Sequence, residues 1–153
     1  MRRIEFYGHE SKGVVAAMIR WRIISSINHI SIGAGSSIFE STALANGVTV
    51  SKKKRADIIM TEQLVVTDDE YVKILKYLNE SVGVEYDFSA FSSFLLNKTR
   101  QNDSKMFCNE FAAGILKIIG VSYKISENLS SPKDFMYLIR GINEGIERKE
   151  LLK

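Results

Sequence analysis

Cys108 is the only cysteine in the chain, and it lies where a helix is predicted to begin. The apolar residues that follow it recur at helical spacing: Phe111, Ala112, Ile115, Leu116 and Ile119. In the first turn of a helix, unpaired backbone N–H groups and the helix dipole favour an anion, which is how a protein holds a thiolate that attacks a carbonyl. The alternative is that Cys108 is a small buried side chain without a chemical role.

A histidine and a carboxylate are predicted to face each other on a β-hairpin. Two strand-like segments, residues 26–32 and 37–42, are separated by a short glycine-containing turn. With Ala34-Gly35 at the centre of this turn, His29 directly faces Glu40, on the side of the hairpin opposite to its apolar residues. A carboxylate in that position fixes the tautomer of a histidine and stabilises its protonated form. The alternative is an exposed cross-strand pair.

The remaining patterns predict the elements that position these three side chains. Besides the hairpin, strands are expected at residues 1–8, 47–51 and 58–66, and a strand followed by a loop within residues 121–128. Helices are expected after Ser11, Thr67, Cys108 and Ser131. Ser11 is a candidate N-cap, and Thr67 with Glu70 has the spacing of a capping box. The pattern indicates an α+β fold.

Length and composition are ordinary for a globular protein and indicate one domain, residues 1–153. A single cysteine excludes an internal disulfide framework and a Cys-based zinc site, and no metal or other cofactor is expected. The second histidine, His9, is expected at the surface, at most near the site. No segment is apolar enough for a transmembrane helix, and the N-terminus lacks a signal-peptide core, so a cytoplasmic location is expected. The oligomeric state is not predicted.

Two basic segments allow a second interpretation. Residues 14–23 form an apolar face suited to packing on a sheet, but Trp21 and the arginines Arg20 and Arg22 also suit a basic amphipathic membrane helix. Residues 52–55 are all basic, which is typical of a solvated loop, with nucleic-acid binding as the alternative. We expect no nucleic-acid partner, since the net charge of +3 is small.

The order of these motifs resembles that of the permuted papain-fold cysteine hydrolases of the NlpC superfamily, most closely the YiiX-like branch. The resemblance covers about residues 4–120. It is carried by Phe6-Tyr7-Gly8 with Ile19-Arg20, Asn28-His29-Ile30-Ser31-Ile32, Ile38-Phe39-Glu40-Ser41, Gly83-Val84-Glu85-Tyr86-Asp87-Phe88 and Phe107-Cys108-Asn109-Glu110-Phe111. Asn109 occupies a position where the family usually has serine.

The resemblance implies a circularly permuted papain-like fold, with an antiparallel sheet packed against helices and the nucleophile at a helix N-terminus. It implies Cys108 as nucleophile, His29 as general base and then acid, and Glu40 as the orienting carboxylate. Tyr86 matches a tyrosine that lies beside the nucleophile and helps to hold the oxyanion, although a core aromatic is an equal alternative. The implied function is a peptidase or amidase with a thioacyl intermediate, and cell-wall peptides are among its candidate substrates.

Two other functions remain open. One is acyl transfer or thioester hydrolysis on a lipid, as in the lecithin-retinol acyltransferase-like group, whose third residue is usually histidine; Glu40 favours the hydrolases. The other is a non-catalytic binding module on the same fold, with Cys108 buried and inert. A pKa of the Cys108 thiol near or above the ordinary value of about 8.5 would favour the binding module. If the protein is an enzyme of either kind, its expected substrate is a peptide, an amide or a lipid.

Overall fold

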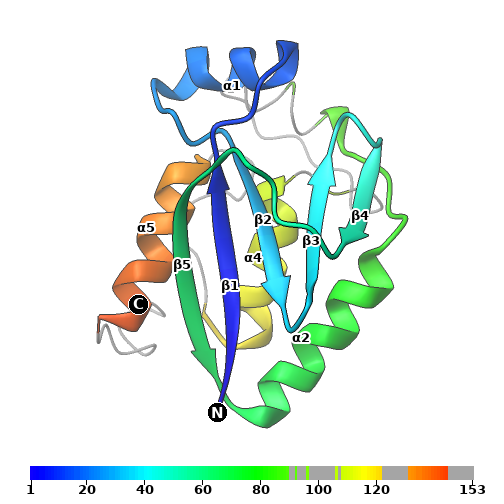
Figure 1. The fold of residues 1–153 in the computed structure, drawn as a ribbon, viewed down its shortest axis with the longest axis vertical. Helices are drawn as coiled ribbons and strands as arrows, with labels where there is room; N and C mark the ends of the chain where they lie inside the picture. The colour runs from blue at the N-terminus through cyan, green and yellow to red at the C-terminus, as the bar shows by residue number, and fades with distance from the viewer. Residues whose placement is uncertain (90–91, 93–95, 97–105, 107, 122–130, 145–153) are drawn as a thin grey trace.

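A computed structural model describes residues 1–89, 92, 96, 106, 108–121 and 131–144. Most of the predicted strand at residues 121–128 lies outside these residues. Five antiparallel strands form one sheet in the order β4-β3-β2-β1-β5 (Figure 1). They are β1 (Arg2–His9), β2 (His29–Ala34), β3 (Ser37–Thr42), β4 (Gly47–Ser51) and β5 (Ile58–Val66). The strands predicted near these positions are confirmed.

Four helices lie among the described residues: α1 (Val14–Ile23), α2 (Asp68–Ser81), α4 (Cys108–Ile118) and α5 (Pro132–Asn143). Helix α4 packs on β2 and β3, α5 packs on β5 and β1, and α2 contacts both α4 and β1. Helix α1 lies at one end of the sheet, at the top of Figure 1. The α+β class is confirmed. None of the described helices combines the length and the apolar composition needed to cross a bilayer.

Local capping signals define where two of these helices begin. The Thr67 side chain accepts a hydrogen bond from the Glu70 N–H, and the Glu70 carboxylate accepts one from the Thr67 N–H, which forms the predicted capping box of α2. Ser131 and Asp134 form the same arrangement at the start of α5. The two helices therefore start at residues that the sequence marks.

The β2–β3 hairpin has a register that differs by two residues from the predicted one. Ala34 pairs with Ser37 around a two-residue turn, Gly35-Ser36, whose glycine has φ of +61°. His29 is therefore diagonal to Glu40 and does not face it directly. Side chains alternate between the faces of a strand with a period of two, so a shift of two residues keeps both side chains on the same face.

Helix α1 begins later than predicted and buries only part of its predicted apolar face. Its N-cap is Gly13, and Ser11 lies before the helix. Ile19 is buried, but Val14 and Met18 are 78% and 40% exposed. The reason is that α1 covers an end of the sheet, where only one side of the helix reaches the buried residues of the neighbouring segments.

Candidate active site

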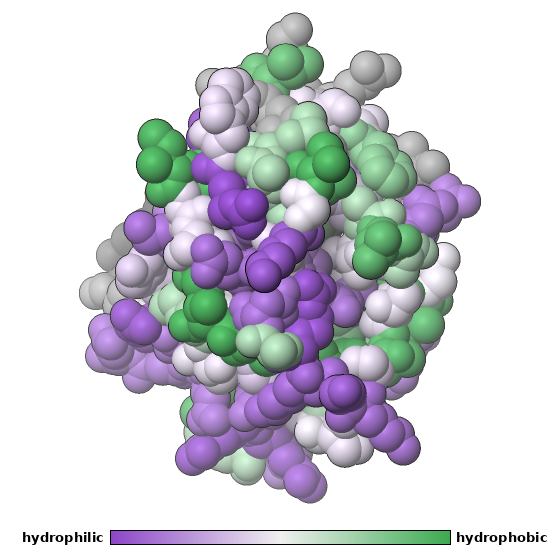
Figure 2. Space-filling view, turned by 45° about the horizontal axis from the view of Figure 1, so that its top comes forward, coloured by the Kyte–Doolittle hydropathy of each residue, from purple (hydrophilic) through white to green (hydrophobic). Residues whose placement is uncertain are grey.

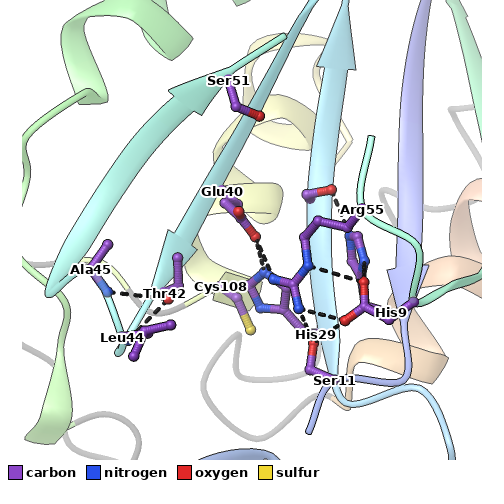
Figure 3. A network of polar contacts seen from close by, with 12 residues as sticks. His9, Ser11, His29, Glu40, Thr42, Leu44, Ala45, Ser51, Arg55 and Cys108 are labelled. Atoms are coloured by element: carbon purple, nitrogen blue, oxygen red, sulfur yellow. Dashed lines mark hydrogen bonds and ion pairs between the residues drawn. The ribbon is translucent and has the colours of Figure 1, made fainter. Parts of the chain in front are cut away.

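Three of the predicted site residues, Cys108, His29 and Tyr86, line one pocket of about 390 Å³. This volume lies in the range of small-molecule binding sites. The pocket is lined by apolar residues of α1, by polar residues that include Ser11, Asn28 and Arg55, and by the apolar side chains of Leu44 and Phe88. The fourth predicted residue, Glu40, is bonded to His29 without lining the pocket. Figure 3 shows the Cys108 sulfur on the same side of the sheet strands as the His29 ring.

Helix α4 contacts both β2 and β3, and its first residue lies near Ile30 of β2. The β2–β3 ladder ends at the pair Ile32–Phe39, so the strands are not paired further toward His29. The backbone N–H groups of Ile30, Cys108 and Asn109 lie near enough to the Cys108 sulfur to favour its thiolate form. The sulfur thus lies against backbone donors from both a strand and a helix N-terminus.

Met106 connects the segment of Tyr86 to the start of α4. Its carbonyl accepts a hydrogen bond from the Ser41 hydroxyl, 2.7 Å away, and its N–H donates to the Glu85 carbonyl at 3.0 Å. Tyr86 also forms a β-bridge with Met106. Because Cys108 follows Met106 by two residues, these contacts fix both Tyr86 and Cys108 relative to β3.

The Cys108 thiol is buried and neutral in this structure. Burial raises the pKa of Cys108 to about 12; the three N–H groups lower it and the nearby charge of Glu110 raises it, so burial dominates. Within the described part of the chain, Cys108 makes no hydrogen bond with His29, and its sulfur lies 3.8 Å from Asn109 Oδ1. The two residues share a pocket, but a preformed thiolate–imidazolium pair is absent from the described residues.

His29 and Glu40 form the predicted pair. His29 Nε2 lies 2.9 Å from Glu40 Oε2. Burial acts to raise the pKa of Glu40, but the hydrogen bond and charge of His29 and the charge of Arg55 outweigh it and hold the pKa at about 2. The carboxylate is therefore ionised and can only accept a hydrogen bond, so a His29 ring that carries a single proton has it on Nε2. Nδ1 is then the nitrogen that can take a proton from a thiol.

Arg55 belongs to the site although the sequence suggested only a solvated basic loop. Its Nη1 donates to Glu40 Oε2 at 3.0 Å, and its Nη2 donates to Ser11 Oγ at 2.8 Å. Its Nε and Nη2 form a two-pronged contact with Asp57, at 3.0 and 2.5 Å. Arg55 thus ties Glu40 to a second carboxylate. The available sequence signal was the Arg-x-Asp spacing just before β5, which is weak without the fold.

His9 is buried beside His29, so its expected surface position is wrong. Its Nδ1 lies 2.9 Å from Asp57 Oδ1, its Nε2 lies 2.7 Å from Ser31 Oγ, and its ring centroid is 5.3 Å from that of His29. Burial first, and then the charge of His29, lower the pKa of His9 to about 4. His9 is therefore neutral at pH 7. It was missed because β1 and β2 pair it directly with His29, a contact between segments far apart in the sequence.

Tyr86 is buried at the pocket wall, with its ring edge-on to Phe88 at a centroid distance of 4.9 Å. Burial raises the pKa of the phenol well above its usual range, and the neighbouring Cys108, Glu110 and Asp87 add to this shift. The phenol is therefore neutral, and a neutral phenol can donate a hydrogen bond to an anion that forms in the pocket.

Comparison of the chain with protein-family models and with curated proteins finds no match. Among the described residues, no three histidine, cysteine, aspartate or glutamate side chains gather as the ligands of a metal ion would.

Proposed function

We propose that the protein is a cysteine-dependent hydrolase that cleaves an amide bond through a thioacyl intermediate. The observation that carries this proposal is that Cys108 and His29 line the same pocket while Glu40 is bonded to His29 Nε2. Nucleophile, base and orienting acid are the three groups that such a reaction needs.

In the proposed reaction, Cys108 Sγ attacks the carbonyl carbon while its proton passes to His29 Nδ1. The carbon–nitrogen bond then breaks, and His29 returns the proton to the leaving amine. Water that gives up a proton to His29 next hydrolyses the thioester, and the thiol is restored. Because the pKa of the free thiol is about 12, His29 takes the proton during the attack itself, and the thiolate does not form beforehand.

The oxyanion of the tetrahedral intermediate would be held by donors beside the sulfur. The N–H of Cys108 lies at the start of α4, and the neutral phenol of Tyr86 lines the same pocket. One such donor is worth roughly 3 kcal/mol in transition-state stabilisation. This supports the role that the family resemblance implied for Tyr86.

We infer a circularly permuted papain-like arrangement for the fold. Supporting it, the histidine strand β2 and the acid strand β3 precede the cysteine helix α4 in the chain, and α4 packs on both strands. In this arrangement the sheet supplies base and acid, and the helix N-terminus supplies the nucleophile.

Two observations favour other functions. The apolar α1 side of the pocket would suit an acyl chain, as in a lipid acyltransferase or thioesterase. The buried thiol with its pKa raised to about 12 favours a binding module in which Cys108 is inert. Both alternatives use the same pocket, so substrate turnover is what separates them.

The proposal is tested by hydrolysis of p-nitrophenyl acetate, an activated acyl ester. We expect wild type to exceed Cys108→Ala and His29→Ala, each of which should lose roughly a hundredfold or more of the enzymatic rate. Glu62→Gln is a matched control, because Glu62 is a strand carboxylate that is bonded to Arg140 at 2.6 Å and lies outside the pocket. Cys108→Ser is a second variant, which removes the sulfur but retains the side-chain volume. Circular dichroism verifies that each variant is folded. Equal rates for wild type and Cys108→Ala would contradict the proposed hydrolase and would favour the binding module, in which Cys108 is inert.

A further inference from the structure

Helix α1 carries apolar side chains on two opposite faces. One face packs inward through Ile19, which lies in a buried cluster with Tyr86 and Cys108. The opposite face is made of residues spaced i, i+4 and i+7: Val14, Met18 and Trp21. A surface helix normally has polar residues on its outer side. Here Trp21 is 79% exposed and Val14 is 78% exposed, so α1 lacks such a polar face.

Further exposed apolar side chains lie across the pocket from α1. Leu44, in the turn between β3 and β4, is fully exposed, and Phe88 is about half exposed. Both line the pocket together with Val14. We call Val14, Met18, Trp21, Leu44 and Phe88 the mouth surface. Figure 2, in which the end of the molecule that carries α1 is turned toward the viewer, shows hydrophobic residues gathered in the upper half of this face.

The segment that carries the outer face of α1 has a positive net charge, and the exposed Glu10 precedes it. Residues 11–24 contain the basic residues Lys12, Arg20 and Arg22 and no acidic residue. The Arg20 guanidinium donates to the Ser11 carbonyl at 2.5 Å, which keeps its charge next to the N-terminal end of the helix. Apolar side chains with a tryptophan, flanked by basic residues, are what an anionic bilayer surface binds.

We propose that the mouth surface docks on an anionic lipid bilayer and so places the pocket entrance at the membrane. In the docked state, Trp21 and Leu44 enter the boundary between headgroups and acyl chains, and the basic residues of α1 face the anionic headgroups. Docking explains why large apolar side chains are exposed on both sides of the pocket. It does not rest on the chemistry of Cys108, because binding can be measured without turnover.

Trp21 is the only tryptophan in the chain, so its fluorescence reports docking directly. We expect its emission to shift to shorter wavelength when vesicles of phosphatidylcholine with phosphatidylserine are added to the full chain. Vesicles of phosphatidylcholine alone should give a smaller shift, and added salt should weaken binding to the anionic vesicles. The variant Lys12→Glu should bind anionic vesicles at least about fivefold more weakly.

Sedimentation with the same vesicles compares variants. Leu44→Ser and Trp21→Ala should each bind roughly tenfold more weakly than wild type. Val72→Ser should bind like wild type, since Val72 is a 65% exposed valine on α2, away from the pocket. The proposal is overturned if wild type stays in solution, or if Leu44→Ser and Trp21→Ala sediment as wild type does. It is also overturned if wild type is a dimer that Trp21→Ala converts to a monomer, which would assign the surface to a second copy.

Discussion

His29 Nε2 lies 2.9 Å from Glu40 Oε2 although the two residues are diagonal on the β2–β3 hairpin. The contact is possible because both side chains leave the same face of the sheet, and the glutamate is long enough to span the diagonal. Because the ionised carboxylate only accepts hydrogen bonds, it favours the His29 tautomer with the proton on Nε2 and leaves Nδ1 unprotonated. The proposed chemistry uses that nitrogen.

Replacing Glu40 by glutamine should lower kcat on the order of a hundredfold, because an amide no longer stabilises the His29 imidazolium and no longer selects its tautomer. The measurement is steady-state hydrolysis of p-nitrophenyl acetate across pH. Glu62→Gln should behave as wild type. A Glu40→Gln enzyme with unchanged kcat at every pH would show that the carboxylate does not act through His29.

Arg55 is a positioning residue in this account, because it holds the Glu40 and Asp57 carboxylates together. Arg55→Met should lower kcat about tenfold with little change in KM, and Arg55→Lys should restore part of the loss, since a lysine supplies the charge without the two-pronged geometry. Arg140→Met is the matched control, because Arg140 also donates through Nε and Nη2 to a strand carboxylate, that of Glu62, and does not line the pocket. A rise in KM with kcat unchanged would assign Arg55 to substrate binding instead.

The buried neutral His9 should make the fold sensitive to acid. Its pKa is about 4 in the folded protein and 6.5 ordinarily, so between these values the unfolded chain binds a proton that the folded protein does not. The contribution of neutral His9 to the free energy of unfolding is complete above pH 6.5. As the pH falls from 6.5 to 4, the free energy of unfolding should decrease by about 3 kcal/mol. Urea unfolding at several pH values measures this loss.

His9→Gln provides the comparison for that titration. Glutamine does not titrate, so the free energy of unfolding of His9→Gln should change less between pH 6.5 and 4, even if the variant is less stable at neutral pH. The pKa values of the Glu40 and Asp57 carboxyls are lowered, so these two groups bind protons in the folded protein, and change its stability, in a more acidic range. Equal slopes for wild type and His9→Gln between pH 6.5 and 4 would contradict the assignment.

The free Cys108 thiol should react slowly with iodoacetamide at neutral pH, because burial raises its pKa to about 12 and only the thiolate is nucleophilic. The same protein unfolded in urea should react much faster, at the rate of an exposed thiol with an ordinary pKa. Mass spectrometry of the alkylated peptide measures both rates. Rapid labelling of the folded protein, unchanged in His29→Ala, would mean that the sulfur is activated without the histidine.

Local patterns predicted most of the fold. The bounds of β4 and β5 and the capping box of α2 match the prediction because alternation and capping depend on residues close together in the sequence. The hairpin register was wrong by two residues, because the segment between residues 33 and 36 allows more than one turn. The face assignment survived that error, since side chains repeat with a period of two along a strand.

The rest of the site depends on contacts between distant segments. Cys108, His29 and Glu40 could be named as candidates from their types and spacing. Arg55 reaches Glu40, and His9 reaches His29, only through the pairing of distant segments, and Asp57, which precedes β5, binds both Arg55 and His9. The sequence left α1 open between packing on the sheet and a basic amphipathic membrane helix, because apolar residues on two sides of a helix give one broad pattern in the sequence.

The most direct test of the central claim is the intact mass of the protein during turnover of p-nitrophenyl acetate. The account predicts that wild type gains one acetyl group, that peptide mapping places it on Cys108, and that His29→Ala gains it far more slowly. Acetylation confined to lysines, equal in wild type and Cys108→Ala, would contradict a thioacyl intermediate and with it the proposed catalysis.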